Sequence, residues 1–472
     1  MSVPLNPIME RFAERTPIPV MARGVLERCL SPQQLDAWFE QVAEAQYTRE
    51  LLFSSVFEVM TEVVFKQQPS VHAAHQARAE TIGVSVTALY NKLNGLEPGT
   101  TAELVRFAAT EAAALIEELG GAKPAPLPGW RVKVLDGNWL EGREHRLKEL
   151  RTLGAAALPG KSVAVFDPAL ELFTDLFPCE DAYTQERALL PAVLETVRAG
   201  ELWLGDRNFC TRGFIETVVG RDAAVLVRAH EGLRFTPLEP MRECGRIATG
   251  KVAEQRVRLG PADELGGLAL RRIRIELDEP TRDGETTLYL LTTLPPQAAA
   301  VLTLAELYLT RWTIETAFLR LTVELRCEID TLGYPRAALF GFAVAAVAFN
   351  VLAVVKAALR RAHGVELIEQ TLSSYYLANE IANVAEALTT VLDPEDWAVF
   401  QTLSVTAMAA WLLELAGQVN LRKYRKHPRG PKKPPPKRKH DPQRPHVSVA
   451  RILTERQAQR KTQQAQRKKM SP

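Results

Sequence analysis

Residues 132–138 read VKVLDGN and residues 202–209 read LWLGDRNF, and these two stretches decide the fold class. In each one, apolar side chains recur at every second position, which is the period of a β-strand. The alternation ends on Asp136 in the first stretch and on Asp206 in the second. Each carboxylate therefore shares a strand face with apolar residues, where it is costly unless it is hydrogen-bonded or bound to a metal.

Two strand-borne carboxylates that converge on one point would suit a hard divalent cation such as Mg²⁺. Taken singly, each of Asp136 and Asp206 is better explained as a residue that caps a turn. Asp167 is a rival candidate because it ends another predicted strand, at 163–166. Pro168 follows it directly, however, and favours a role in the turn.

The segments around these stretches alternate between strand and helix patterns, which is typical of an α/β layer architecture. The chain is 46% hydrophobic and 24% charged, as expected for a globular protein with ample core material. Five widely spaced cysteines show neither zinc-ligand spacing nor a disulfide framework. The expected elements are helices over 1–118, a linker at 120–129, strands at 161–166, 202–206 and 223–228, helices at 186–198 and 212–219, β-structure over 230–300, and helices over 301–420.

Charge is distributed unevenly along the chain. The net charge is only +2, but residues 421–472 hold 18 Lys and Arg against two acids, Asp441 and Glu455. Such a basic segment points to a polyanionic partner, nucleic acid or a membrane surface. Its many prolines argue against a packed core there, and the alternative is a merely solvated tail.

One segment, 337–355, carries no charged residue over nineteen positions. That length approaches what a bilayer requires, so the segment is either a membrane span or a helix buried in a core. The surrounding sequence reads as a soluble enzyme, and we expect the core helix.

A third polar constellation occurs at residues 308–315, which read YLTRWTIE. On a helix, Tyr308, Arg311 and Glu315 would fall within about 60° of one another. The face would then present an aromatic ring, a cation and a carboxylate. Alone, it could equally be a surface salt-bridge face.

Together, the three constellations resemble the DDE transposases of bacterial insertion sequences, in particular the cut-and-paste group with a Y-R-E-K signature. The matching stretches are LDGN at 135–138, LGDRNF at 204–209 and Y-x₂-R-x₃-E at 308–315. The run EHRLKELR at 144–151 and the basic tail also look like this family. The resemblance extends from about residue 130 to 350.

The resemblance implies an α/β RNase H-like catalytic core interrupted by an all-β insertion, with an N-terminal helical DNA-binding domain, C-terminal helices and a basic disordered tail. The expected division is 1–125 for the helical domain that binds DNA ends, 126–229 for the first part of the core, 230–300 for the insertion, 301–362 for the second part of the core, 363–420 for the C-terminal helices and 421–472 for the tail.

The resemblance also implies a chemistry. Asp136, Asp206 and Glu315 would be the catalytic residues and would hold two divalent ions, Mg²⁺ or Mn²⁺. The reactions would be nicking of the transposon end, formation and opening of a hairpin, and strand transfer into target DNA. The partner would be double-stranded DNA, bound by a homodimer in the bacterial cytoplasm at the nucleoid, with no role for a membrane.

The sequence departs from the signature at one position. The signature lysine should fall seven residues after Glu315, where the chain has Thr322. Arg326, one helical turn further, would lie on the same face and is expected to supply the missing phosphate contact. The alternative is a catalytically impaired, transposase-derived DNA-binding protein. A nuclease of the same fold acting on RNA is a further alternative.

DNA contacts are expected from several segments. Residues 79–93 have helix-turn-helix character, with Gly83 in the turn; an ordinary helix pair is the alternative. Some members of the family stack a flipped base on an aromatic ring near the insertion; Phe235 and Tyr289 are candidates here, and the role is not assigned to either. The residues expected to contact DNA are Tyr308, Arg311, Arg326, Asn91, Lys92, Arg425, Lys432 and Lys433.

Overall fold

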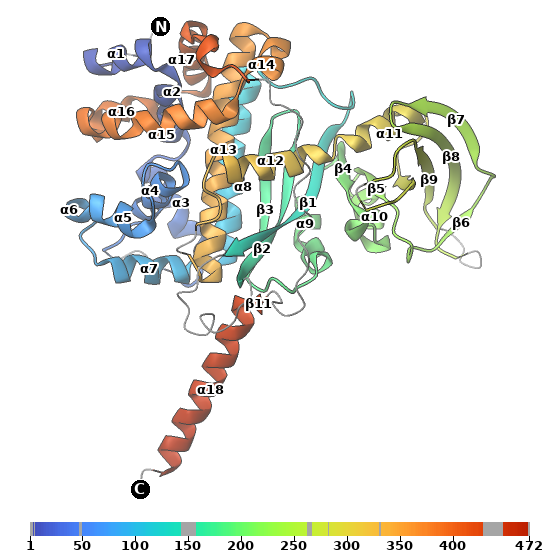
Figure 1. Ribbon diagram of the computed structural model, residues 1–472, viewed down its shortest axis with the longest axis horizontal. Coiled ribbons are helices and arrows are strands. Elements are labelled where there is room, and N and C mark those ends of the chain that lie inside the picture. The colour runs from blue at the N-terminus through green and yellow to red at the C-terminus, as the bar shows by residue number, and fades with distance from the viewer. Residues whose placement is uncertain are drawn as a thin grey trace.

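A large mixed β-sheet forms the centre of the protein, and helices cover both of its faces (Figure 1). This is the mixed α/β architecture that the sequence predicts. The computed structural model describes residues 3, 5–46, 50–142, 157–261, 267–281, 283–329, 332–427 and 447–470. The first five strands are β1 (Arg131–Gly142), β2 (Ala157–Asp167), β3 (Leu172–Cys179), β4 (Glu201–Gly205) and β5 (Ala224–Arg228).

These five strands lie in the order β3-β2-β1-β4-β5. The pairs β3–β2 and β2–β1 are antiparallel, whereas β1–β4 and β4–β5 are parallel. The strand β3 is absent from the sequence prediction, and β1 extends past its predicted end at Asp136. Parallel strands need helical crossovers, and here η2 (Glu186–Leu189) and α9 (Leu190–Thr196) precede β4, while η3 (Arg207–Phe209) and α10 (Arg212–Val219) precede β5.

Alternating side chains of β1 supply two separate hydrophobic cores. Val132 and Val134 belong to the larger core, which also contains helices from both ends of the chain. Leu135 points to the other face and joins a smaller core with residues of α9 and α10. The period-2 pattern of the strand thus places even-numbered residues, Asp136 included, on the face of the larger core.

The longest helix, α13 (Pro335–His363), passes through the larger core beside α8 (Pro98–Leu119) (Figure 1). Among the described residues it is the one helix long and apolar enough to cross a membrane, yet 94% of its most apolar stretch is buried inside the protein. The expectation of a core helix is therefore confirmed. The buried amide of Asn350 exchanges hydrogen bonds of 2.9 and 2.8 Å with the backbone of Phe173 in β3.

Helices from the two chain ends pack together on the side of α13 away from the sheet (Figure 1). All five cysteines, which lie in described segments, are free thiols. The N-terminal helices are α1 (Pro7–Arg15), α2 (Pro17–Cys29), α3 (Pro32–Val42), α4 (Phe53–Val64), α5 (Val71–Ala77), α6 (Ala79–Ile82) and α7 (Val86–Gly95), and the C-terminal ones are α14 (Val365–Thr371), α15 (Ser374–Val391), α16 (Pro394–Gln401), α17 (Val405–Gln418) and η4 (Leu421–Tyr424).

Residues 230–300 add antiparallel strands to the far edge of the same sheet. The last of them, β10, pairs with β5, so the added strands continue the core sheet. The predicted hairpin around residues 278–284 is the β9–β10 pair. The chain then returns through α11 (Val301–Leu309) and α12 (Trp312–Val323). The added strands are β6 (Phe235–Pro237), β7 (Arg242–Ile247), β8 (Gly250–Leu259), β9 (Ala269–Leu277) and β10 (Thr287–Thr292).

The end of the tail is ordered, contrary to the sequence expectation. Strand β11 (Val447–Ser448) pairs with β2, and α18 (Val449–Met470) projects from the body (Figure 1). Seven of the eight prolines of the tail lie upstream of α18, which is rich in Ala, Gln, Arg and Lys, all good helix formers. Asp181 anchors the segment by accepting hydrogen bonds from Ser448 (2.7 Å) and Arg451 (2.9 Å).

Candidate active site

The two predicted aspartates lie side by side at the centre of the sheet. Strands β1 and β4 pair in parallel register up to Leu135 opposite Gly205, so Asp136 and Asp206 are the next residues on adjacent strands. Asp206 follows the end of β4, and its carboxylate accepts a hydrogen bond of 2.8 Å from the Asn208 amide. Asp136 does not end its strand, because β1 continues beyond it in antiparallel pairing with β2.

The third constellation reaches the same place. Tyr308 lies in the last turn of α11 and Glu315 in the first turn of α12, with Arg311 at the junction. The Arg311 guanidinium donates to Asp136 Oδ2 at 2.7 Å and to Glu315 Oε1 at 2.9 Å. Arg311 thus bridges the strand-borne and helix-borne carboxylates, which excludes a purely surface salt-bridge face.

The electrostatics of Asp136 reflect a crowded acidic site. Burial raises the pKa of Asp136 to about 7, and the nearby carboxylates of Asp206 and Glu315 add to this effect, whereas Arg311 opposes it. Burial also raises the pKa of the Tyr308 hydroxyl, so this buried ring stays neutral beside Arg311. A carboxylate that its surroundings disfavour in the charged form is a functional-site candidate, because a structural carboxylate is normally stabilised.

The donor set suits a divalent cation in kind, because carboxylate oxygens are the ligands that Mg²⁺ prefers. Asp136 and Glu315 already share one cation, the guanidinium of Arg311. Within the described segments, no group of three or more His, Cys, Asp and Glu side chains is close enough to hold a metal ion as the side chains stand. Arg311 occupies the space between Asp136 and Glu315, where a cation shared by these two carboxylates would lie.

A fourth carboxylate, which the sequence reasoning missed, lies on the opposite face of the same strands. The Glu186 side chain, from η2, accepts a hydrogen bond of 3.2 Å from the Asn208 side chain and another from Trp139. Burial raises the pKa of Glu186, and the charge of Asp206 adds to the effect. No periodic pattern marks Glu186, since η2 is a single short turn after a loop.

Arg326 does not reach this site. Helix α12 ends at Val323, so the helical spacing that aligned Arg326 with Tyr308 does not apply. The Arg326 guanidinium instead donates to the carbonyl oxygens of Gln68 (3.2 Å) and Pro69 (2.7 Å) in the N-terminal region. Thr322 donates to the Phe318 carbonyl at 3.3 Å and offers no positive charge. The expectation that Arg326 lies on the face of Tyr308, Arg311 and Glu315 in place of the signature lysine is wrong, because its guanidinium binds the N-terminal region.

Residues 79–93 contain the short helix α6, a turn at Gly83 and the start of the longer helix α7, which does not distinguish a helix-turn-helix from an ordinary helix pair. Gly83 has a φ of 68°, which suits glycine, and ends α6. The hydroxyl of Ser85 then caps α7 by accepting from the Ala88 amide. Asn91 is exposed on α7, whereas the Lys92 ammonium lies over the Phe39 ring, 4.6 Å from its centre.

The remaining predicted DNA contacts are distributed as follows. The guanidinium of Arg272 lies between the two candidate stacking rings, 4.8 Å from the centre of Phe235 and 4.0 Å from that of Tyr289. Arg425 is exposed after η4. Lys432, Lys433 and the run at 144–151 lie outside the described residues.

Asp167 has the structural role that its sequence context favours. Its carboxylate is buried, accepts from the amides of Ala169 and Leu170 at 3.1 Å each, and pairs with Arg131 at 2.8 Å. It therefore closes the turn between β2 and β3.

Comparison with known proteins shows a similarity to one family over part of the chain. None of the curated proteins compared matches the chain. Residues 161–347 match the family model described as the transposase DDE domain. The matched segment contains Asp206, Arg311 and Glu315, and Asp136 precedes it. Such domains act on DNA and use divalent metal ions, which agrees with a site where the charges of Asp206 and Glu315 act on Asp136. Residues 161–347 are therefore similar to a transposase DDE domain.

Proposed function

We propose that this protein is a cut-and-paste transposase of a bacterial insertion sequence, with Asp136, Asp206 and Glu315 as its catalytic triad. The observation that carries the proposal is the bridge of Arg311 between Asp136 and Glu315, beside Asp206. The strand order β3-β2-β1-β4-β5, with its change from antiparallel to parallel pairing at β1, supports an RNase H-like core. The strands over 230–300 would be an insertion into that core.

The proposed roles of the site residues follow from their charge and burial. Asp136, Asp206 and Glu315 would hold two Mg²⁺ or Mn²⁺ ions, which stabilise the attacking and leaving oxygens of an in-line phosphoryl transfer. Arg311, released from its carboxylates, has the planar fork that suits a DNA phosphate. Tyr308, neutral and buried next to it, would hold the guanidinium in place. One such site would serve nicking, hairpin formation, hairpin opening and strand transfer.

Binding of the transposon end would rest on the N-terminal helices and the tail. Asn91 is exposed on α7, which would be the second helix of a helix-turn-helix. The basic tail would contact phosphates without reading sequence. Pairing of two ends would require a homodimer on DNA, in the bacterial cytoplasm at the nucleoid. The departure at Thr322 favours one alternative, a catalytically impaired DNA-binding descendant.

The test is cleavage of a DNA duplex that bears the inverted repeats flanking the gene. We expect Mg²⁺- or Mn²⁺-dependent nicking at the repeat ends, followed by a hairpin on the same end. Specific binding without nicking would establish the impaired descendant instead. Nicking of an RNA/DNA hybrid in preference to the duplex would overturn the DNA-transposase proposal.

Deletion of residues 421–472 is expected to weaken binding to all DNA sequences by a similar factor. For every phosphate that the tail no longer neutralises, the slope of log affinity against log salt should flatten by roughly 0.9, because fewer counterions are released. The measurement is the binding constant on end-bearing and unrelated duplexes over a salt series. An unchanged slope would show that the tail does not touch the phosphate backbone.

A further inference from the structure

The turn that carries Asp206 is held from the side by η2. The Glu186 carboxylate accepts from the side-chain amide of Asn208 at 3.2 Å, and the Arg187 guanidinium donates to the Asn208 carbonyl at 2.7 Å. The backbone amide of Asn208 in turn donates to the Asp206 carboxylate at 2.8 Å. Asn208 therefore connects Glu186 to Asp206 through two hydrogen bonds.

The other oxygen of Glu186 faces the strand that carries Asp136. Gly137, the next residue on β1, leaves the space that this oxygen fills, because a methyl group on Gly137 would collide with the Glu186 carboxylate. Trp139, two residues further on the same face, hydrogen-bonds the carboxylate. The ammonium of the buried Lys161 on β2 lies over the Trp139 ring, 4.9 Å from its centre.

We propose that Glu186 is a positioning residue that sets the position of the Asp206 carboxylate relative to Asp136. It acts through its hydrogen bond with Asn208 on one side and through its contact with the backbone at Gly137 on the other. Glu186 touches both carboxylate-bearing segments from the face opposite Arg311 and Glu315. A side chain that contacts both segments restricts how far the Asp136 and Asp206 carboxylates can move apart when the charge between these carboxylates changes. The proposal rests on the proposed function for its catalytic consequence, but the contacts themselves stand apart from it.

Hydrogen exchange of the full-length protein tests the contacts without any DNA. Glu186→Ala and Asn208→Ala should each accelerate amide exchange in the peptide covering residues 206–210, because Asn208 loses its restraint. Glu216→Gln, which removes an exposed ion pair with Arg212 on α10, should leave that peptide unchanged. Unchanged exchange in Glu186→Ala would overturn the proposal, whatever the protein does to DNA.

Cleavage of an end-bearing duplex tests the consequence. Glu186→Ala and Asn208→Ala should each slow single-turnover nicking by roughly 10- to 100-fold, the usual cost of losing a group that orients a metal ligand, with DNA affinity unchanged. The double variant should be no slower than either single one, because both break the same connection. Glu186→Gln should keep most of the rate, since its amide oxygen can still accept from Asn208.

The possible failures have different meanings. The inference would be overturned if the rate losses of Glu186→Ala and Asn208→Ala multiplied in the double variant. It would also be overturned if Glu186→Gln were as slow as Glu186→Ala while Asn208→Ala nicked at the normal rate. Either result would indicate that Glu186 binds the metal directly instead of positioning Asp206. A wild-type protein that does not nick would overturn the proposed function alone, and the exchange experiment would still decide the role of Glu186.

Discussion

Asp136→Asn, Asp206→Asn and Glu315→Gln are each expected to abolish strand cleavage and strand joining together. An amide keeps the shape of the side chain but removes an anionic oxygen that a hard cation needs. Loss of a residue that merely supports a metal ligand costs 10- to 100-fold, so loss of a ligand should exceed about 100-fold. Both reactions should fail alike because one site performs them. The measurement is metal-dependent nicking and joining of an end-bearing duplex.

Two controls accompany these amide variants. Binding to end-bearing DNA should survive in all three variants, because the proposed DNA contacts of the N-terminal helices and tail are intact. Asp136→Asn should also melt at the same or a slightly higher temperature without metal, because the raised pKa of Asp136 shows that its charged form is disfavoured in the fold. Glu216→Gln is the matched surface control and should retain full activity. Robust nicking by any one amide variant would remove that residue from the triad.

Asp167 would be a poor control for the same experiment. Its sequence position, at the end of a strand, resembles those of Asp136 and Asp206. In the structure, however, it is buried against Arg131 and Lys133 and closes a turn. An amide there would disturb the fold, so loss of activity would carry no information about chemistry.

The two strands that carry the aspartates were predictable because the local alternation of apolar residues is visible in sequence. Period-2 patterns located β1 and β4, and adjacent parallel strands place residues after matched positions side by side. The strand β3 escaped because its burial comes in pairs of residues rather than alternating ones. The convergence of Asp136 and Asp206 was expected from the resemblance to DDE transposases, whereas the width of the sheet was not predicted.

The side-chain geometry beyond the strands depended on contacts that sequence does not display. The spacing of residues 308–326 assumed one continuous helix, but the chain breaks between α11 and α12, and α12 stops at Val323. The Thr310 hydroxyl bonds back to the Leu307 carbonyl at the break. Arg311 lies at the site where its spacing placed it, but its hydrogen bond to Asp136 was not predicted. Arg326 was expected on the same face, whereas its guanidinium binds carbonyl oxygens of the N-terminal region. Glu186 gave no signal, because its role arises only when η2 packs against β1 and η3.

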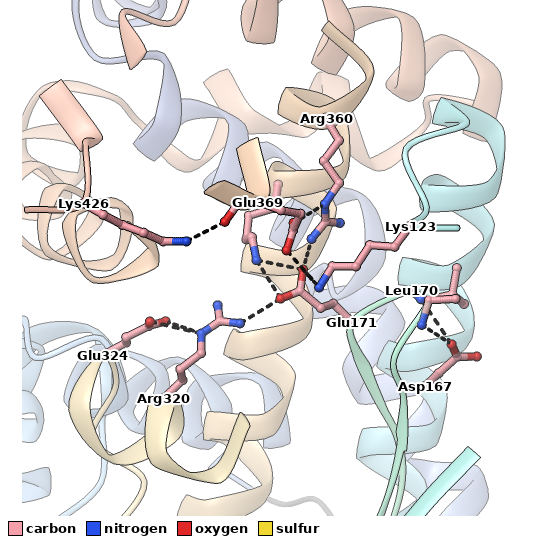
Figure 2. A network of polar contacts seen from close by, with 11 residues as sticks. Lys123, Asp167, Leu170, Glu171, Arg320, Glu324, Arg360, Glu369 and Lys426 are labelled. Carbon is pink, nitrogen blue, oxygen red and sulfur yellow. Dashed lines mark hydrogen bonds and ion pairs between the residues drawn. The ribbon is translucent and has the colours of Figure 1, made fainter. Parts of the chain in front are cut away.

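Glu171→Gln is expected to be the most destabilising single substitution away from the active site. Glu171 lies in the turn before β3, is 6% exposed, and receives the Lys356 ammonium at 2.6 and 2.7 Å and the Arg320 guanidinium at 2.9 Å (Figure 2). Arg360 and Lys123 also pair with it. Four cations thus meet one buried carboxylate, which joins α12, the helix of Glu315, to α13 and the sheet.

Removing this charge leaves cations buried without their partner, and breaking a buried ion pair in this way costs about 3–5 kcal/mol. The shift of the urea midpoint at unchanged slope measures the loss. Glu243→Gln is the matched control, because it removes a surface pair with Arg274 and should cost no more than about 1 kcal/mol. A Glu171→Gln protein as stable as the control would show that the network contributes no net stability.

Acid should break the ion pairs of the same network over a definite pH range. Burial alone would raise the pKa of Glu369, but Lys356, Arg360 and Lys123 lower it to about 2 from an ordinary value of 4.5 (Figure 2). The stabilisation from Glu369 is therefore complete above pH 4.5 and is lost as the pH falls from there toward 2. Glu369→Gln should flatten the pH dependence of stability in that range and lower stability at neutral pH. If Glu369→Gln left both unchanged, the cations would be stabilised by Glu171 alone.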